Sequence, residues 1–306
     1  PFLDACKTVH SVNSCKGGTI YCETFLPEAD FSAVIVIFHG FCEYCAKYDE
    51  LTYYMLRQGF AVCRFDHRGH GFSARDVSNP YKVHIEDYQI YADDAFSVVM
   101  NIAKPLAGNA PLFLFAHSMG GAIASLFLQQ YPDVFKTSVL SSPMFMLNIL
   151  GLPFGLARII TKILCFFRGS KSYIPGKGDF PPHLTFNKSS KPSISERRFM
   201  YHYRNRLGNT RLQTWSGTLA WLDASLDAIA QLRKKQCLRQ ICTPIMLFQA
   251  EKDETVLPGG QNAFVKKVTS AQLVVVPNAN HEIYNMKNEL LISWYSQLFA
   301  FYREYC

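Results

Sequence analysis

The sequence is poor in charged residues for its length. Only 18% of its 306 residues are Asp, Glu, Lys or Arg, whereas 49% are hydrophobic. A disordered chain has few apolar groups and high charge, so this composition excludes disorder and indicates a folded core. The length suits one large α/β domain, or a domain that carries an insertion.

The ten cysteines follow no repeated spacing. A chain of this length can bury its own core and needs no disulfide framework, so we expect free thiols in a reducing compartment. Cys42 and Cys45 have the CxxC spacing of a zinc site, but no second pair accompanies them and a structural zinc needs four ligands. We therefore predict neither a metal nor a cofactor, and assign no role to this pair.

A targeting signal and a long apolar span are also missing. No charged segment followed by an apolar run stands at the start, so the expected location is the cytoplasm, with the inner face of the membrane as the alternative. The most apolar stretch, 144–167, contains Gly151, Pro153 and Gly155. Its uncharged run ends at Arg158, short of the roughly 18 residues that a span requires. This stretch is typical of a lid or an interfacial helix.

The net charge of +7 comes from one segment. Residues 144–240 contain 16 Lys and Arg against 4 Asp and Glu, a balance of +12, which leaves −5 for the rest. Because this basic segment is also apolar, we expect it to contact an anionic membrane surface and not nucleic acid. Several of its arginines could hold a bilayer or a phosphate headgroup, or simply face solvent: Arg197, Arg198, Arg204, Arg206 and Arg211.

Short apolar runs alternate with helical patterns over most of the chain. The runs predict buried parallel strands at 33–38, 60–66, 112–116, 137–140, 244–249 and 273–276. Helices are predicted at 48–58, 88–103, 120–130, 258–267 and 288–302. The runs 6–12 and 19–25 alternate in polarity and favour an antiparallel edge pair. The alternation is that of an α/β fold with a mostly parallel central sheet covered by helices on both faces.

The strand signals stop between about residues 143 and 238, where Pro, Gly, Lys and Arg interrupt helical pieces. We interpret this segment as an inserted helical cap. The predicted core domain is therefore 1–142 and 241–306, and the predicted cap is 143–240.

Ser118 stands between a predicted strand and a predicted helix. Ala116 and Gly120 flank it at two positions on either side, as in the G-x-S-x-G elbow with one departure, Ala116 in the first position. Small residues are needed there because the turn is sharp. A helix cap is the alternative for a serine at this place, but the strand before it and Gly121 after it favour a nucleophile.

A serine nucleophile needs a base and an orienting acid, and these follow in the order Ser, acid, His. His281 lies in a loop after the last predicted strand, and Asp253 lies in a loop after the strand before it. Both loops reach the edge of the sheet at which Ser118 stands. Glu251 and Glu254 share the acid loop and are the competing candidates.

Two backbone amides are candidates for the oxyanion hole. One is that of Met119, directly after the nucleophile, and the other is that of Phe41, in the loop FHGFCE after the strand 33–38. Gly40 would let this loop turn tightly beside the site.

The segments FHGFCE, FDHRGHGFS, AHSMGGAIA, SSPMF, FQAEKDETV and NHEI resemble the serine α/β-hydrolases of the monoacylglycerol lipase and lysophospholipase group. Among these, the chain is most similar to the bacterial membrane-associated lysophospholipases. The resemblance implies an α/β-hydrolase fold, Ser118 as nucleophile, His281 as base, Asp253 as acid, and Phe41 and Met119 as oxyanion donors. Phe41 is bulkier than the residue that many members have there, which bears on the width of the acyl site.

These observations predict a serine hydrolase that cleaves the ester of a single-chain lipid, first a lysophospholipid and second a monoacylglycerol. A general carboxylesterase and an acyltransferase are further alternatives. An aminopeptidase would need an acidic pocket, and the cap has few carboxylates. A non-catalytic membrane-binding protein would be expected to have lost a member of the triad. We expect an acyl chain to lie against the apolar half of the cap, formed by Met144, Phe145, Met146, Leu147, Ile149 and Leu150. The oligomeric state is not predicted.

Overall fold

The computed structural model describes residues 2–149, 151–186 and 193–306. In the first part of the chain the elements are α1 (Phe2–Cys6), β1 (Lys7–Asn13), β2 (Thr19–Phe25), β3 (Ala33–Phe38), η1 (Cys45–Tyr48), α2 (Asp49–Arg57), β4 (Phe60–Phe65), β5 (Lys82–Val83), α3 (Tyr88–Val98), η2 (Val99–Ala103), α4 (Lys104–Ala107), β6 (Leu112–His117), α5 (Met119–Gln130) and β7 (Thr137–Ser141). The later elements are α6 (Phe154–Arg168), α7 (Glu196–Leu207), η3 (Thr210–Leu212), β8 (Ser216–Gly217), α8 (Leu219–Gln231), α9 (Lys235–Leu238), β9 (Ile245–Ala250), α10 (Pro258–Val265), β10 (Ala271–Val276), η4 (Ile283–Asn285) and α11 (Asn288–Arg303).

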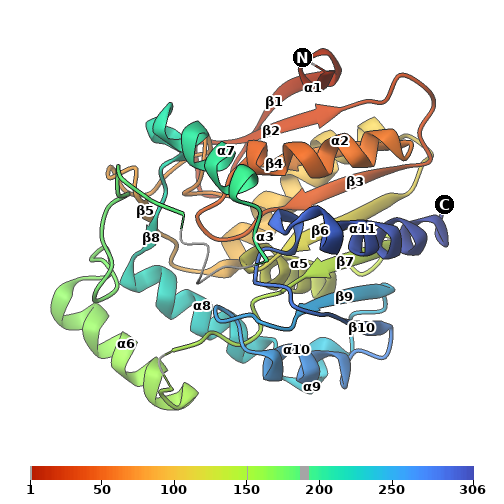
Figure 1. Cartoon of the computed structure of the whole chain (residues 1–306). Coiled ribbons are helices and arrows are strands. Elements are labelled where there is room, and N and C mark those ends of the chain that lie inside the picture. The colour runs from red at the N-terminus through yellow and green to blue at the C-terminus, as the bar shows by residue number, and fades with distance from the viewer. Residues whose placement is uncertain (1, 150, 187–192) are drawn as a thin grey trace.

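The main sheet has eight strands in the order β1-β2-β4-β3-β6-β7-β9-β10. The pairs β1–β2 and β2–β4 are antiparallel, and the strands from β4 to β10 are paired in parallel. Figure 1 shows β1 at the top of the sheet and β10 at the bottom. The predicted antiparallel edge pair and parallel sheet are confirmed.

The two faces of the sheet carry separate hydrophobic clusters, because successive side chains of a strand point to opposite faces. On β3, Val34, Val36 and Phe38 pack with α3, α5, α8 and α10, whereas Ala33 and Ile35 pack with α2 and α11. Figure 1 shows α2 and α11 in front of the sheet. Every residue of β3 is buried, so the continuous apolar run 33–38 reflects cover on both faces.

The elements differ from the predictions mainly at their ends. The predicted helix 88–103 continues past Pro105, through a π-helical turn at Val99–Ala103 and into α4. Pro105 lies in the first turn of α4, where its missing N–H has no helical partner to lose. The predicted bounds 88–103 therefore match α3 together with the π-helical turn, and α4 adds one further turn.

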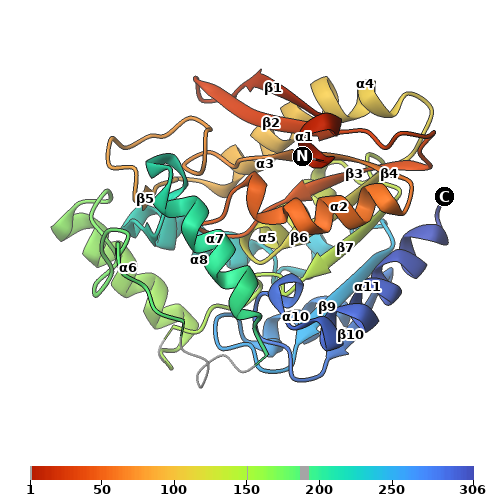
Figure 2. The ribbon, with the colours of Figure 1, turned by 45° about the horizontal axis from the view of Figure 1, so that its top comes forward.

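The segment between β7 and β9 contributes no strand to the main sheet in its described residues. Its strand β8 pairs instead with β5, Lys82 opposite Ser216. Figure 2 shows α6 and α7 on one side of the molecule, beyond the ends of the strands. Helix α8 of the same segment packs on the core, because its Trp221 and Ile229 belong to the cluster that includes α3 and α5. The division into a core domain and a cap 143–240 stays a prediction.

Helix α6 leaves much of its apolar face uncovered. The exposed large side chains on α6 and just before it are Leu152, Leu156, Ile159, Ile163, Phe166 and Phe167. Their spacing of three to four residues places them on one face. The opposite side holds Arg158 and Lys162, which pair with Asp227 and Asp223 of α8. No helix in the described ranges is long and apolar enough to cross a membrane.

Candidate active site

Ser118 lies on a strained turn between β6 and α5. Its φ of +52° is rare for a residue with a side chain. The turn brings the backbone of α5 close to its neighbours, since a Cβ at Gly120 would lie 2.2 Å from the carbonyl oxygen of Phe38 and one at Gly121 would lie 2.6 Å from Pro143 Cβ. Only glycine fits at these two positions, which explains the small residues of the sequence motif.

His281 bridges Ser118 and Asp253. Its Nε2 lies 2.8 Å from Ser118 Oγ, and its Nδ1 lies 2.7 Å from Asp253 Oδ2. In the tautomer that fits both contacts, Nδ1–H donates to the carboxylate and Nε2 accepts the hydroxyl proton. The three residues come from loops that follow β6, β9 and β10, and parallel strands bring these loops to one edge of the sheet.

The carboxylate of Asp253 is held by its own loop. Its Oδ1 accepts hydrogen bonds from the backbone N–H groups of Thr255 and Val256, at 2.9 and 3.0 Å. The competing acids are elsewhere, because Glu251 accepts from the backbone N–H of Asn278 and Glu254 is exposed. The structure therefore brings Asp253, and neither glutamate, to His281.

The two amides predicted for the oxyanion hole lie on either side of the elbow. Met119 opens α5, directly after Ser118. Phe41 lies in the loop after β3, where its ring stacks on that of Trp221 with centroids 4.0 Å apart. The next residue, Cys42, has a φ of +57° and donates its N–H to His70 Nε2 at 3.1 Å. Their role as donors to a substrate oxygen stays a prediction.

Behind this loop lies a buried carboxylate that the sequence analysis missed. Glu43 Oε2 accepts from the Gly40 N–H at 2.6 Å and from the Tyr48 hydroxyl at 2.6 Å, and Oε1 accepts from Lys47 Nζ at 2.6 Å and from the Tyr284 hydroxyl. Burial by itself would raise the pKa of Glu43, but the charge of Lys47 and these hydrogen bonds hold that pKa well below its usual value. Glu43 is therefore ionised, and it fixes the loop that carries Phe41.

Lys47 and Glu282 complete this cluster. Lys47 Nζ also contacts Glu282 Oε1, at 2.7 Å, and Asn285 donates to the other oxygen of the same carboxylate. Burial alone would raise the pKa of Glu282, but Lys47 lowers it to about 2. The spacing of Glu43 and Lys47, four residues apart just after the Gly40 turn, was the available sequence signal.

His117 packs beside His281. Its Nδ1–H donates to the Ser141 carbonyl at 3.0 Å, and its ring centroid lies 4.9 Å from that of His281. Burial lowers the pKa of His117 to about 4, so the ring is neutral near pH 7. A neutral neighbour adds no positive charge that would oppose protonation of His281.

A cavity of about 520 Å³ opens onto His281 and the Phe41 loop. Its apolar lining comes from this loop and from the segment between β7 and β9: Phe41, Phe180, Leu184, Ile194, Phe199, Tyr203 and Trp215. The predicted acyl wall was wrong for Met144 and Phe145, which are 2% and 3% exposed and belong to the core cluster below α10, where Phe145 stacks on Phe264. They lie shortly after β7, which ends at Ser141, and pack within this core cluster. Leu150 lies outside the described residues.

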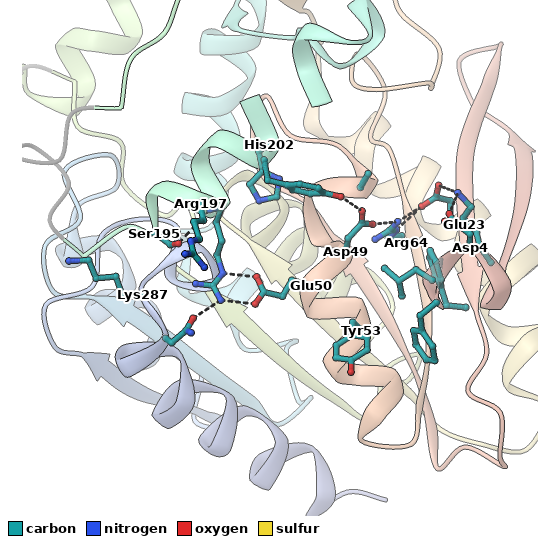
Figure 3. Close-up of a pocket in the computed structure, with 18 of the residues that line it drawn as sticks. Asp4, Glu23, Asp49, Glu50, Tyr53, Arg64, Ser195, Arg197, His202 and Lys287 are labelled. Carbon is teal, nitrogen blue, oxygen red and sulfur yellow. Dashed lines mark hydrogen bonds and ion pairs between the residues drawn. The ribbon is translucent and has the colours of Figure 1, made fainter. Parts of the chain in front are cut away.

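A larger cavity, of about 960 Å³, lies on the other side of α7 and does not contain the triad. Figure 3 shows Arg197 and Lys287 at one end of it and Arg64 with Asp49 and Glu23 at the other. At this cavity Arg198 binds both oxygens of Glu50 at 2.6 Å. Of the two alternatives for Arg198, a lipid contact or a solvated face, the structure shows neither, because its charge is paired with Glu50.

The cysteines whose side chains the structure describes are free thiols. Cys42 and Cys45 are buried free thiols, and burial raises the pKa of Cys42 to about 12. No group of metal-ligating side chains is found among the described residues. Both thiols are neutral at physiological pH and pack as small apolar groups.

Comparison with known proteins agrees with this architecture. Residues 29–288 match the family described as serine aminopeptidase, S33. The chain is 30% identical over 288 residues to the probable lysophospholipase L2 of Haemophilus influenzae. The aligned region covers 92% of this chain and 88% of that protein. It is 30% identical over 257 residues to lysophospholipase L2 of Escherichia coli, with 82% and 74% covered. Over 139 residues it is 34% identical to the monoglyceride lipase of Mus musculus, with 45% and 44% covered.

Solved structures resemble the whole chain at low identity. A thermostable carboxyl esterase from Bacillus coagulans gives a TM-score of 0.78 at 17% identity, covering 98% of this chain and 99% of that one. A soluble variant of monoglyceride lipase from Saccharomyces cerevisiae gives 0.75 at 17% identity, with 97% and 94% covered. At such identities the likeness concerns the fold, which is that of the α/β-hydrolases. Because 260 of its 306 residues match this one family, the chain belongs to the serine aminopeptidase S33 family of α/β-hydrolases.

Proposed function

We propose that the chain hydrolyses the carboxylic ester of a single-chain lipid, with Ser118 as nucleophile, His281 as base and Asp253 as the acid that orients the base. One observation carries this proposal. His281 reaches Ser118 Oγ at 2.8 Å and Asp253 Oδ2 at 2.7 Å through its two ring nitrogens, which is the arrangement that activates a serine hydroxyl.

The reaction follows from this geometry in two steps. Ser118 Oγ attacks the ester carbonyl while its proton passes to His281 Nε2, and Asp253 stabilises the imidazolium that forms. The amides of Phe41 and Met119 donate to the carbonyl oxygen as it becomes negative, an effect of about 3 kcal/mol per donor. The alcohol leaves with the proton from His281, and water activated by the same histidine then releases the fatty acid.

The first substrate is a lysophospholipid and the second is a monoacylglycerol. The names of the relatives support both, since lysophospholipases L2 match most of the chain and a monoglyceride lipase matches part of it. The aromatic and aliphatic lining of the 520 Å³ cavity suits an acyl chain, and each methylene buried there contributes about 0.8 kcal/mol. Acyl transfer to an alcohol other than water would use the same acyl-enzyme.

An aminopeptidase, which the family description names, is disfavoured by the surroundings of His281. A free amine needs a carboxylate with spare acceptor capacity, but Glu282 is bound to Lys47 and Asn285 and Glu43 is saturated by four donors. Glu254 at the rim is exposed to solvent, where a single ion pair contributes little.

Contact with an anionic membrane is proposed for the apolar face of α6. Phe166 and Phe167 are 82% and 77% exposed, and Arg168, Lys171 and Lys177 follow them on the surface. An apolar helix face next to basic residues partitions into the headgroup region of a bilayer. Such contact would present the cap to the layer that contains the substrate.

The test compares wild type with Ser118→Ala on lysophosphatidylcholine, a monoacylglycerol of the same acyl chain and a short soluble ester, together with labelling by a fluorophosphonate. We expect labelling and all hydrolysis to vanish in Ser118→Ala, while circular dichroism and thermal unfolding stay close to wild type. Hydrolysis that survives in Ser118→Ala would disprove the assignment of the nucleophile. A wild type that cleaves the short ester and neither lipid would disprove the lipid substrate.

A further inference from the structure

Arg206 brings a positive charge to the cavity that opens onto His281. It lies near the C-terminal end of α7 and lines the same 520 Å³ cavity as His281 and Phe41. Its guanidinium donates to the carbonyl of Cys42, the residue that follows Phe41. This contact fixes the charge beside the loop predicted to hold the ester oxygen.

Among the described residues, the two fully buried arginines are neutralised by acids, whereas the half-buried Arg75 donates to backbone carbonyls outside this cavity. Arg64 binds Glu23 and Asp49, and Arg68 binds Asp76 and Asp94. In the part of the chain that the structure describes, the acceptor found for the Arg206 guanidinium is one neutral carbonyl oxygen. A guanidinium has five N–H donors, so most of the hydrogen-bonding capacity of Arg206 is unused by the protein.

The surroundings of Arg206 strengthen its interaction with an anion. The guanidinium carbon lies 5.8 Å from the ring centroid of Tyr44 and 5.7 Å from that of Trp215. Aromatic rings at this distance stabilise the cation and restrict its position. Because Arg206 is half-buried, a charge-assisted hydrogen bond to its guanidinium is worth more than at an open surface.

The other cations of the cavity are less suited to bind a ligand. Lys47 is bound by Glu43 and Glu282, and its charge is therefore compensated. Lys252 lies at the exposed rim, where its Nζ donates to Asn278 Oδ1. Solvent screens a charge at that place. Among the described residues that line the cavity, Arg206 is therefore the half-buried cation for which no carboxylate partner is found.

We propose that Arg206 binds the phosphate of a lysophospholipid headgroup while the ester of the same molecule lies at Ser118. The inference rests on the proposed function. In such a substrate the three carbons of glycerol separate ester from phosphate, so a phosphate site must lie near the oxyanion loop, and the tie to Cys42 places Arg206 there. The planar fork of a guanidinium matches two phosphate oxygens. A monoacylglycerol has no group that would use this site.

The experiment measures kcat/KM of wild type, Arg206→Gln, Arg206→Lys and Arg204→Gln with lysophosphatidylcholine and with a monoacylglycerol of the same acyl chain. Arg204→Gln is the matched control, because Arg204 is exposed on the same helix. We expect Arg206→Gln to lower kcat/KM for lysophosphatidylcholine at least tenfold more than for the monoacylglycerol. Arg206→Lys keeps the charge and loses the fork, so its kcat/KM for lysophosphatidylcholine should lie between those of wild type and Arg206→Gln. Arg204→Gln should match wild type on both substrates.

Three results would overturn the inference. Equal losses on both substrates would mean that Arg206 only positions the Cys42 carbonyl. No change on lysophosphatidylcholine in Arg206→Gln would mean that the headgroup does not reach it. The third arm adds inorganic phosphate at constant ionic strength. Phosphate could inhibit monoacylglycerol cleavage by wild type but not by Arg206→Gln, while Arg206→Gln cleaves lysophosphatidylcholine as well as wild type. That result would indicate a site for free phosphate and not for the headgroup. A wild type inactive on lysophosphatidylcholine would instead refute the proposed function.

Discussion

The polar cluster behind Ser118 and the apolar face of α6 differ in the kind of group that they bury or expose. The cluster buries charged groups, whereas α6 exposes large apolar side chains. Glu43 is 2% exposed and accepts four hydrogen bonds. Phe166 on α6 is 82% exposed, and the one aromatic ring that it contacts in the described structure is that of the neighbouring Phe167. Burying an unpaired charge and exposing a row of large apolar groups are both costly.

The difference indicates where each region finds its partner. The Glu43 cluster is satisfied within the chain, so it serves to fix the loop beside Ser118. The α6 face has no cover within the described chain, and the membrane contact proposed above would provide one. The predictions below test this contrast, beginning with the largest expected effect.

The largest effect is expected for the acid of the triad. Asp253→Asn should lower kcat about 10,000-fold, because the amide favours the wrong tautomer of His281. Glu251→Gln and Glu254→Gln, the other acids of the loop, should each change kcat less than tenfold. Steady-state kinetics with a short soluble ester measures this without any membrane. A comparable loss in either glutamate variant would show that the loop, and not one carboxylate, supports His281.

Glu43→Gln should lower kcat by about 10- to 100-fold with little change in KM. The loop that carries the Phe41 amide would lose its charged anchor. Removing one oxyanion donor outright costs about 100- to 1,000-fold in kcat, and a displaced donor should cost less. Removing one partner of a buried ion pair should also lower the free energy of unfolding by about 3 kcal/mol. Glu282→Gln, which removes the partly exposed partner of the same lysine, is the control and should do less in both assays. If kcat is unchanged while stability falls, Glu43 has a structural role only.

The double substitution Phe166→Ser/Phe167→Ser tests the uncovered face. Binding to anionic vesicles, measured by cosedimentation, should weaken at least tenfold, because each ring buried in the interface contributes about 1.5–3 kcal/mol. Activity on a short soluble ester and the melting temperature should stay at wild-type values. Ile292→Ser on α11, where Ile292 is 72% exposed, removes a comparable apolar group away from α6 and should leave vesicle binding intact. Equal binding by both variants would rule out α6 as the contact.

The smallest effect concerns pH and the neutral His117. Its pKa of about 4 in the folded protein lies below the ordinary 6.5, so between these values the unfolded chain binds a proton that the folded chain does not. The free energy of unfolding should therefore fall as the pH drops from 6.5 to 4, by about 3 kcal/mol from this group. Urea unfolding at several pH values should show a shallower dependence for His117→Asn. An identical slope would mean that His117 is not the responsible group.

Much of the fold could be predicted because its signals are local. The apolar run 33–38 is a strand at the predicted residues, and the strand, serine and two glycines at 112–121 form the turn that the spacing indicated. The Glu43 cluster could not be predicted in the same way. The spacing of Glu43 and Lys47 indicates one pair of the cluster, but its donor Tyr284 lies 241 residues away, and no local pattern indicates that Tyr284 meets Glu43.

The sequence by itself determined the alternation of strands and helices, the strained turn at Ser118 and the order in which serine, acid and histidine occur, because each of these depends on neighbouring residues. The tertiary structure decided which acid faces His281, which apolar side chains line the cavity and which arginines keep an uncompensated charge. These depend on packing between segments as far apart as the 163 residues that separate Ser118 from His281. Distances across such gaps are set by how the layers pack, and no local pattern encodes them.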